Sequence, residues 1–255
     1  MRIVIIGSGN VATVLGRKMI LAHHEVIQVV SRSEDHAAQL AKELKSTHTT
    51  DINRIDTNAQ LYLLSISDSA LYHAHDWLKV KKQIVVHTAG SVPMDILKLT
   101  SENYGVLYPL QSLRKEIKKI PEIPFLIDGN TDDTKSQIAS FAKSLSPNTH
   151  FANDAQRGKL HIGSVITNNF SNHLYALAQD FCANEKVDFN LLLPLINELG
   201  KRLTLGPAMN FQTGPAVRND QVTINHHLAL LKNYPQLLKL YSVFSESIIE
   251  THSKK

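Results

Sequence analysis

The sequence predicts an α/β protein, in which a doubly wound, mostly parallel sheet is followed by a smaller all-α domain. Three observations support this fold class. Short apolar runs alternate with helical patterns in the first half of the chain, a glycine-rich turn joins the first run to the first helix, and strand-like segments disappear after about residue 153. Because 255 residues exceed one typical domain, we predict two, at 1–152 and 153–255.

The elements of the first domain follow from the alternation of apolar runs and amphipathic segments. The apolar runs predict strands at 2–6, 26–30, 61–66, 83–87, 104–108, 125–128 and 149–152, with a weaker one at 46–50. The segments between them predict helices at 9–22, 33–44, 68–79, 93–100 and 131–145. Asp132 and Asp133 in the first turn of the last helix complement its dipole.

The second domain is predicted to contain only helices. Long helical patterns cover 154–183, 189–204, 220–231 and 234–252. Gly206-Pro207 and Gly214-Pro215 bracket a loop between the second and third of these helices. Asp220 is a suitable N-cap for the third.

Composition excludes several classes of protein. The single cysteine, Cys182, rules out an intramolecular disulfide or a multi-cysteine zinc site and is typical of a reducing compartment. The apolar run Ile3–Ile6 is too short for a signal peptide, and no apolar stretch has the length of a membrane span. We therefore expect a soluble, cytoplasmic protein without a membrane partner.

Charge and histidine spacing narrow the expected ligands. The net charge of +4 favours small anionic molecules but is weak evidence for nucleic acid, which we do not expect as a partner. The adjacent pairs His23-His24 and His226-His227 point apart on a helix, so we predict no metal site.

The turn Gly7-Ser8-Gly9-Asn10-Val11-Ala12 fits the G-x-G-x-x-A fingerprint of a Rossmann dinucleotide site, since it follows an apolar strand and opens a helix. Gly7 permits the tight turn, and Gly9 lets the backbone approach a pyrophosphate. The free N–H groups of Ser8, Asn10 and Val11 are expected to face the phosphates. The alternative is a glycine-rich turn without a ligand.

The end of the second strand predicts which dinucleotide binds. An acidic residue there would hold the ribose 2′-hydroxyl of NAD, but this chain has Ser31-Arg32-Ser33. Arg32 offers a fork of donors for a 2′-phosphate, and the two serines add hydroxyl groups, so we predict NADP. Ser33 can also cap the following helix, and Glu34 or Asp35 could still reach a ribose.

Residues at the carboxyl ends of the fourth and fifth strands are expected to line the nicotinamide half of the site. These are the turns Ser65–Asp68 and His87–Ser91. In the first turn, capping of the following helix is an equal alternative for Ser67 or Asp68. In the second, His87 ends an apolar strand.

Three segments carry a resemblance to a known family: Val86–Gly90, Tyr108–Ser112, and Thr213–Asp220 with His227 downstream. Across nearly its whole length the chain resembles bacterial NADP oxidoreductases with a Rossmann-like N-terminal domain and a helical C-terminal domain of uncertain function. These are distant relatives of pyrroline-5-carboxylate reductase, ketopantoate reductase and the 6-phosphogluconate and β-hydroxyacid dehydrogenases. The resemblance implies hydride transfer in a cleft between the domains and a homodimer formed through the helical domain.

Two residues depart from these families. Tyr108 stands where members of the family often carry histidine, and Lys159 is not spaced from Asn168 as in the Lys-x-x-x-Asn pair of the β-hydroxyacid dehydrogenases. Their lysine chemistry is therefore not carried over.

Candidate catalytic residues lie in the first long helix, where a polar stripe is predicted on one face. Its members are His161, Ser164, Asn168, Asn172 and Tyr175. His161 could act as a general acid and Asn168 could orient a carbonyl or imine, whereas the alternative is a hydrogen-bond network that faces the other domain or a second subunit.

Substrate contacts are expected from Ser91, Gln111 and Ser164, and from Arg218, which could clamp a carboxylate. Alternatively, Arg218 and Asp220 hold their turn together.

The sequence thus favours an NADP(H)-dependent oxidoreductase that acts on a small anionic carbonyl, hydroxyl or imine compound. Two alternatives remain open: a non-catalytic NADP(H)-binding sensor or interaction protein, and hydride exchange with a deazaflavin coenzyme, suggested by fold kinship alone.

Overall fold

The computed structural model describes residues 1–253, which form two compact units: Met1–Asn168 and the chain from Asn169 onward. We describe each unit by itself. The sequence-based domain boundary at 152/153 coincides with the end of the last strand, whereas the units divide later, so the helix that begins at Asp154 belongs to the first unit.

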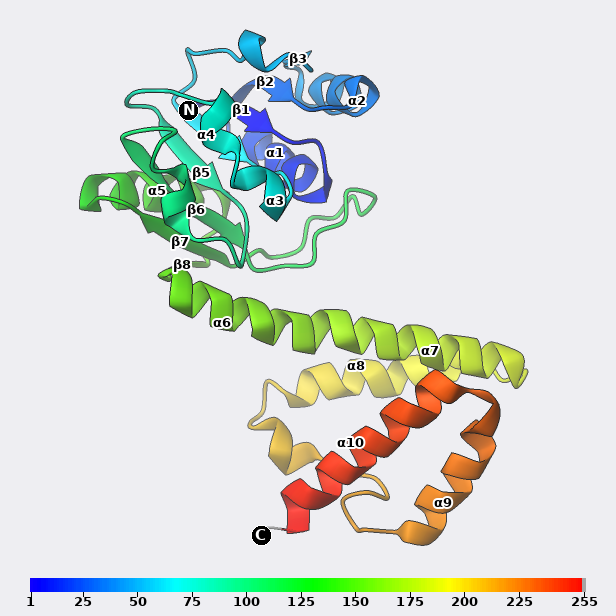
Figure 1. Ribbon diagram of the computed structural model, residues 1–255. Helices are drawn as coiled ribbons and strands as arrows, with labels where there is room; N and C mark the ends of the chain where they lie inside the picture. The colour runs from blue at the N-terminus through cyan, green and yellow to red at the C-terminus, as the bar shows by residue number, and fades with distance from the viewer. Residues whose placement is uncertain (254–255) are drawn as a thin grey trace. The chain divides into compact units, whose positions relative to one another are not determined.

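The first unit is built on one eight-stranded sheet of order β3-β2-β1-β4-β5-β6-β7-β8 (Figure 1). All neighbouring strands are parallel except β6 and β7. The strands are β1 (Arg2–Ile6), β2 (Glu25–Val30), β3 (Thr47–Thr49), β4 (Leu61–Leu64), β5 (Ile84–His87), β6 (Asn103–Pro109), β7 (Phe125–Gly129) and β8 (Thr149–Phe151). The predicted α/β class and mostly parallel sheet are confirmed.

Both faces of the sheet are buried, which explains why its strands are continuous apolar runs. In β1, Ile3 and Ile5 join one hydrophobic cluster, whereas Val4 and Ile6 join another on the opposite face. The first cluster is completed by α1 (Asn10–Leu21), α2 (Glu34–Leu44) and α5 (Asp132–Leu145). The second is completed by α3 (Asp68–Leu71), α4 (Ala74–Trp77) and the 3₁₀ turn Met94–Leu97.

Two predicted helices of the first unit are corrected by the structure. The helix expected at 68–79 is broken into α3 and α4, because His73 leaves the helical conformation (φ −106°, ψ 8°). The helix expected at 93–100 is only the 3₁₀ turn Met94–Leu97. There the Thr100 hydroxyl donates to the Leu97 carbonyl at 2.6 Å and competes with the helical hydrogen-bond pattern.

The helix predicted at 154–183 contains a change of helical geometry. It consists of α6 (Asp154–Ser164), a π-helical segment Val165–Phe170 and α7 (Ser171–Asn184). The division between the two units falls inside the π-helical segment. Because a π-helix has more residues per turn than an α-helix, residue spacing across it no longer predicts a shared face.

The second unit is helical throughout the part that the structure describes. After α7 come the 3₁₀ turn Phe189–Leu192, α8 (Leu193–Arg202), the 3₁₀ turn Ala208–Phe211, α9 (Gln221–Leu230), the 3₁₀ turn Leu231–Asn233 and α10 (Pro235–Ser253). Asp220 caps α9 as predicted, since its side chain accepts the Thr223 N–H at 3.1 Å. Between Met1 and Ser253, the chain forms no helix with the length and apolarity that a membrane crossing requires.

Candidate functional site

The glycine turn between β1 and α1 has the geometry of a phosphate-binding loop. Gly7 has φ +116°, and a Cβ there would lie 2.1 Å from the Ser65 carbonyl oxygen, so only glycine fits. A Cβ on Gly9 would meet nothing within 4 Å, and Gly9 caps α1 without a side-chain hydrogen bond. The turn is therefore open at Gly9, as the approach of a diphosphate to the backbone requires.

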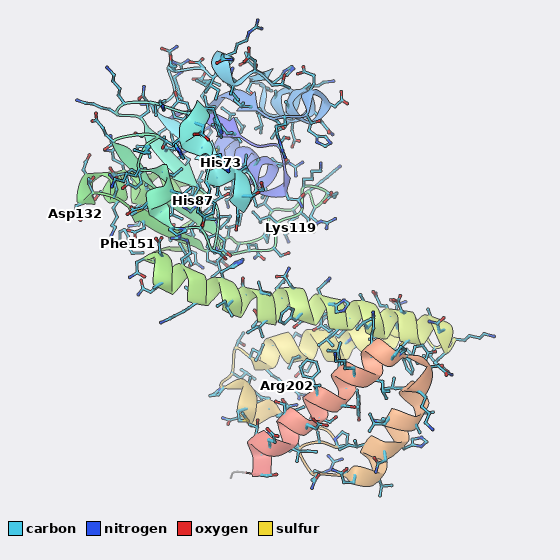
Figure 2. The ribbon with its side chains drawn as sticks, in the orientation of Figure 1. His73, His87, Lys119, Asp132, Phe151 and Arg202 are labelled. Carbon is cyan, nitrogen blue, oxygen red and sulfur yellow. The ribbon has the colours of Figure 1, made fainter. Side chains whose placement is uncertain are left out.

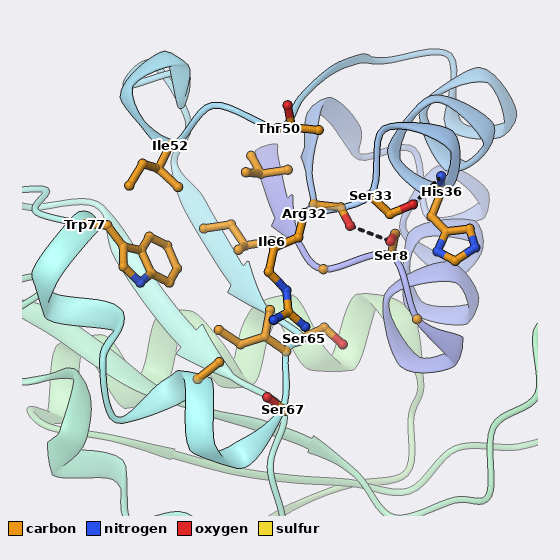
Figure 3. Close-up of a pocket in the computed structure, with 16 residues that line it drawn as sticks. Ile6, Ser8, Arg32, Ser33, His36, Thr50, Ile52, Ser65, Ser67 and Trp77 are labelled. Carbon is orange, nitrogen blue, oxygen red and sulfur yellow. Dashed lines mark hydrogen bonds between the residues drawn. The ribbon is translucent and has the colours of Figure 1, made fainter.

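A cavity of about 430 Å³ opens beside this turn, at the carboxyl ends of β1, β2 and β4 (Figure 3). It collects most of the predicted cofactor residues, namely Gly7, Ser8, Gly9, Ser31, Arg32, Ser33 and Ser67. Ser65, from the turn that was expected to line the nicotinamide half, also lines it. The structure adds Thr50, Ile52, Ala70 and Trp77, together with His36, none of which was predicted as a site residue. Most of these additions lie in helical segments that follow β2, β3 and β4, and their approach to β1 depends on the tertiary fold.

Asn10 and Val11 of the predicted set do not line this cavity. The Asn10 Oδ1 accepts the Lys115 N–H at 3.2 Å and so ties the β6–β7 loop to α1. Val11 packs against the core. Their side chains have structural roles, while contacts from their backbone N–H groups to a phosphate stay a prediction.

The end of β2 has the donors that a 2′-phosphate needs. The Ser8 and Ser31 hydroxyls lie 2.7 Å apart, and the Arg32 side chain projects from the same turn (Figure 3). Ser33 caps α2, because its Oγ accepts the His36 N–H at 3.4 Å.

The two nearby acids do not contribute to the cavity lining. The Glu34 Oε1 lies 2.8 Å from the His48 Nε2 on β3, and Asp35 is exposed in the first turn of α2. The observation removes the main reason to expect NAD, because no carboxylate of this turn is placed to hold a ribose hydroxyl.

Ser67 and His87, both predicted to line the cofactor site, differ in their surroundings. Ser67 lines the cavity and makes no capping hydrogen bond, contrary to the capping alternative.

The prediction that His87 lines the cofactor site is wrong, because His87 is fully buried at the end of β5. The His87 Nδ1 accepts the Ala89 N–H at 3.2 Å, and burial, with a smaller effect of the nearby Arg157 charge, lowers its pKa to about 3. It is a neutral core residue that shapes the turn after β5.

His161 lies within the first unit, against β6 and the turn after β5. The His161 Nδ1 is 2.9 Å from the Tyr108 hydroxyl, and the two rings meet edge to face. A Cβ on Gly90 would lie 2.6 Å from the same Nδ1, so the absence of a side chain at Gly90 makes room for the imidazole. Burial raises the pKa of Tyr108, which keeps its phenol protonated at neutral pH.

Arg157 was not predicted as a site residue. It fixes α6 close to the pair formed by Tyr108 and His161. Its side chain is 1% exposed, and its Nη2 donates to the Val92 carbonyl and contacts Asp154 Oδ1 at 2.8 Å. The Asp154 carboxylate in turn accepts the Met94 N–H at 3.1 Å. Since Arg157 and His161 are one helical turn apart, this network fixes the position of His161 relative to Gly90.

The rest of the predicted polar stripe is not assembled by hydrogen bonds to His161. The Ser164 hydroxyl donates to the His161 carbonyl at 2.7 Å, so it is bonded to its own helix. Asn168 is exposed in the π-helical segment, where the spacing that predicted a common face no longer holds. Its orienting role stays a prediction.

The remaining predicted substrate residues lie in three places. Ser91 is exposed beside Gly90. Gln111 supports its own loop, because its Nε2 donates to the Glu122 carbonyl at 3.0 Å. Arg218 lies in the second unit, where the Thr223 hydrogen bonds and, less strongly, the Arg218 charge lower the pKa of Asp220. Binding of a substrate carboxylate by Arg218 stays a prediction.

Comparisons with known proteins identify the family and the fold to which the chain is similar. Residues 2–90 match the family described as NADP oxidoreductase coenzyme F420-dependent, and residues 123–248 match a domain of unknown function (DUF2520). The chain is similar to the crystal structure of a "putative NADP oxidoreductase" from Bacteroides fragilis, with 36% identity, 98% of each chain covered and a TM-score of 0.92.

More distant structures share the fold. A reductive aminase from Aspergillus terreus in complex with NADPH is 14% identical over 98% of this chain and 94% of its own, with a TM-score of 0.72. A 1-pyrroline-5-carboxylate reductase from Streptococcus pyogenes is 13% identical over 98% of each chain, with a TM-score of 0.63. A curated relative, glutamyl-tRNA reductase from Methanococcus maripaludis, is 24% identical over 53% of this chain, which spans 38% of that protein's length.

Proposed function

The chain belongs to the family of NADP oxidoreductases that join a Rossmann-like domain to a C-terminal helical domain, and on this premise we propose the reaction that it catalyses. It transfers a hydride between NADP(H) and a small anionic compound that carries a carbonyl, hydroxyl or imine group. The family resemblance read from the sequence is thereby confirmed, while the reaction and its substrate class are the proposal.

NADP is the cofactor of this family, as predicted. The observation that carries the proposal is the cavity at the glycine turn, whose donor set fits this cofactor. Gly7 and Gly9 leave the diphosphate path open, while Ser31 and Arg32 supply donors at the 2′-phosphate end without a competing carboxylate. When bound, NADP(H) supplies or accepts the hydride.

His161 is proposed as the residue that moves the proton. Its Nδ1 faces Tyr108, which leaves Nε2 to give a proton to, or take one from, the substrate oxygen or nitrogen. The family resemblance and the names of two structural relatives, an imine reductase and a reductive aminase, support a carbonyl or imine at this place. Asn168 is proposed to orient that group, and Arg218 remains a candidate for binding a substrate carboxylate.

The experiment follows NADPH oxidation by the full chain with a panel of ketoacids, aldehydes and cyclic imines. We expect turnover with at least one class. His161→Ala should lower kcat by about 100-fold or more and leave the Kd for NADPH unchanged, because general acid catalysis contributes about 10²–10⁴-fold.

His150→Ala is the matched control, since His150 is an exposed histidine on β8. Loss of NADPH binding together with activity in His161→Ala would assign His161 a structural role. Tight NADPH binding without turnover across the panel would support the non-catalytic sensor instead.

A second candidate reaction follows from the family description, which names coenzyme F420. In this reaction the hydride passes between NADP(H) and a deazaflavin instead of a carbonyl or imine compound. The same panel tests it when F420 is included as an acceptor, because the reduced and oxidised deazaflavin differ in absorbance.

A homodimer formed through the second unit is also proposed. In the described part of this unit, few side chains are buried, while Leu191, Leu195, Leu205 and Val222 are 77%, 67%, 76% and 83% exposed. Large apolar side chains that are exposed in one chain are expected to become buried where a second copy covers them.

A further inference from the structure

His36 separates two cavities of the first unit. One is the cofactor cavity, and the other, of about 200 Å³, lies between α1, α2 and the β6–β7 loop. Ser8 and His36 line both cavities. In Figure 3 the imidazole of His36 lies beside Ser8 and below Ser33, on the side of the turn away from Trp77.

Local hydrogen bonds place this imidazole at the Ser31-Arg32-Ser33 turn. Ser33 accepts the His36 N–H and thereby starts α2, so His36 projects from its first turn. Ser8 is held by Ser31 across the turn at 2.7 Å. A phosphate bound by Ser31 and Arg32 would therefore lie within the reach of the His36 ring.

The acidic side chains around the two cavities are paired, whereas two of the cations are not. Arg17 is paired with Glu43 and donates to the Lys115 carbonyl at 2.7 Å, and Glu116 is paired with Arg114 at 3.2 Å. On the other side, Glu34 is paired with His48. Within residues 1–253, Arg32 and Lys115 have no carboxylate partner. Arg32 lines one of the two cavities that His36 lines, and Lys115 lines the other, so both cations are available to balance the charge of a bound anion.

We propose that His36 is a ligand of the 2′-phosphate and that it takes up a proton when NADP(H) binds. The inference rests on the proposed cofactor site. A phosphate carries close to two negative charges at neutral pH, and such a charge stabilises an adjacent imidazolium, which then donates a charge-assisted hydrogen bond. Because NAD(H) lacks this phosphate, its binding should not change the protonation of His36. Discrimination between the two dinucleotides then becomes stronger as the pH falls.

The experiment is calorimetric titration of the full chain with NADPH and, separately, with NADH, at pH 7.5 in two buffers of different ionisation enthalpy. At this pH the free 2′-phosphate is mostly dianionic, so its own proton release is small. We expect uptake of a fraction of a proton with NADPH and none with NADH. His36→Gln should abolish the uptake and weaken NADPH by about tenfold, the effect of one hydrogen bond to a charged group, while the Kd for NADH stays the same.

Two control variants separate this role from general electrostatics. His150→Gln removes an exposed histidine on β8 and should keep the full uptake. Lys115→Gln removes a charge at the second cavity but keeps the imidazole of His36, so the uptake should remain.

Proton uptake that persists in His36→Gln, or its absence from the unsubstituted chain, would overturn the role of His36 and leave the proposed reaction intact. Conversely, absence of turnover with every substrate would reject the proposed reaction, yet the calorimetric result would stand, because binding alone is measured.

Discussion

Arg32 is the residue at which the preference for NADP is most directly tested. Its guanidinium projects into the cofactor cavity, where no acid of the same turn opposes it. Arg32→Ala should raise the Kd for NADPH by about 10- to 100-fold and that for NADH by much less, because one or two charge-assisted hydrogen bonds are lost. Fluorescence titration measures both constants. Arg54→Ala, at an exposed arginine paired with Asp51, is the control, and equal weakening of both nucleotides would refute the assignment.

Gly90 tests whether the contact between Tyr108 and His161 matters for turnover. A methyl group there would meet the imidazole at 2.6 Å and displace it from the Tyr108 hydroxyl. Gly90→Ala should therefore lower kcat at least tenfold without changing the Kd for NADPH. Gly158→Ala is the matched control on α6, because its Cβ would meet nothing within 4 Å; it should stabilise the helix by up to about 1 kcal/mol. Unchanged kcat in Gly90→Ala would contradict the role of His161.

His87 gives stability a defined pH dependence. Its pKa falls to about 3 on folding, so it is neutral in the folded protein, whereas an unfolded histidine becomes protonated below about 6.5. The unfolded state then binds more protons, and the free energy of unfolding should fall by about 1 kcal/mol per pH unit between pH 6 and pH 4. Urea titrations at several pH values measure this slope. The slope should be shallower in His87→Gln by about that amount, and an unchanged slope would mean that His87 does not carry it.

At the scale of the element, one buried side chain, Arg157, holds helix α6 in place. Arg157→Met keeps most of the side-chain volume but removes the contacts to Val92 and Asp154. We expect a loss of about 2–3 kcal/mol in the free energy of unfolding, toward the lower end for buried pairs because Asp154 is half-exposed. Thermal unfolding checks this, with Lys159→Met as the control at an exposed position of the same helix. Equal melting temperatures would show that Arg157 does not anchor α6.

The elements that the sequence predicts well are those whose residues carry the whole signal. Strand β1 is buried on both faces, so Ile3 to Ile6 form a continuous apolar run, and the glycine turn follows because only Gly7 tolerates the contact with Ser65. By contrast, the break at His73 and the π-helical segment Val165–Phe170 leave no mark on hydrophobic spacing. Propensity and periodicity predict that a helix exists, not where its geometry changes.

The site follows the same division. Ser31, Arg32 and Ser33 were found because they lie at a fixed distance along the chain from the glycine turn. His36 lies only one turn further, but its position in the cavity depends on how α2 packs beside α1. The pairing of Tyr108 with His161 joins β6 to α6, and Arg157 is buried only because that packing exists. Such contacts between distant segments are properties of the folded chain.

At the scale of the whole molecule, the exposed leucines of the second unit predict self-association. Leu195 on α8 is 67% exposed, and Leu195→Glu should convert a dimer to a monomer in sedimentation velocity experiments, because it would bury a charge in the interface. Leu21→Glu is the matched control, since Leu21 on α1 is 72% exposed in the first unit. A monomeric unsubstituted chain would reject the dimer.

The cofactor cavity is lined only by residues between Ile6 and Trp77. All residues that line the cavity are therefore translated before the helical second unit. A ligand that binds only the folded protein shifts the equilibrium toward it, so a cofactor bound in this cavity would stabilise the first unit directly.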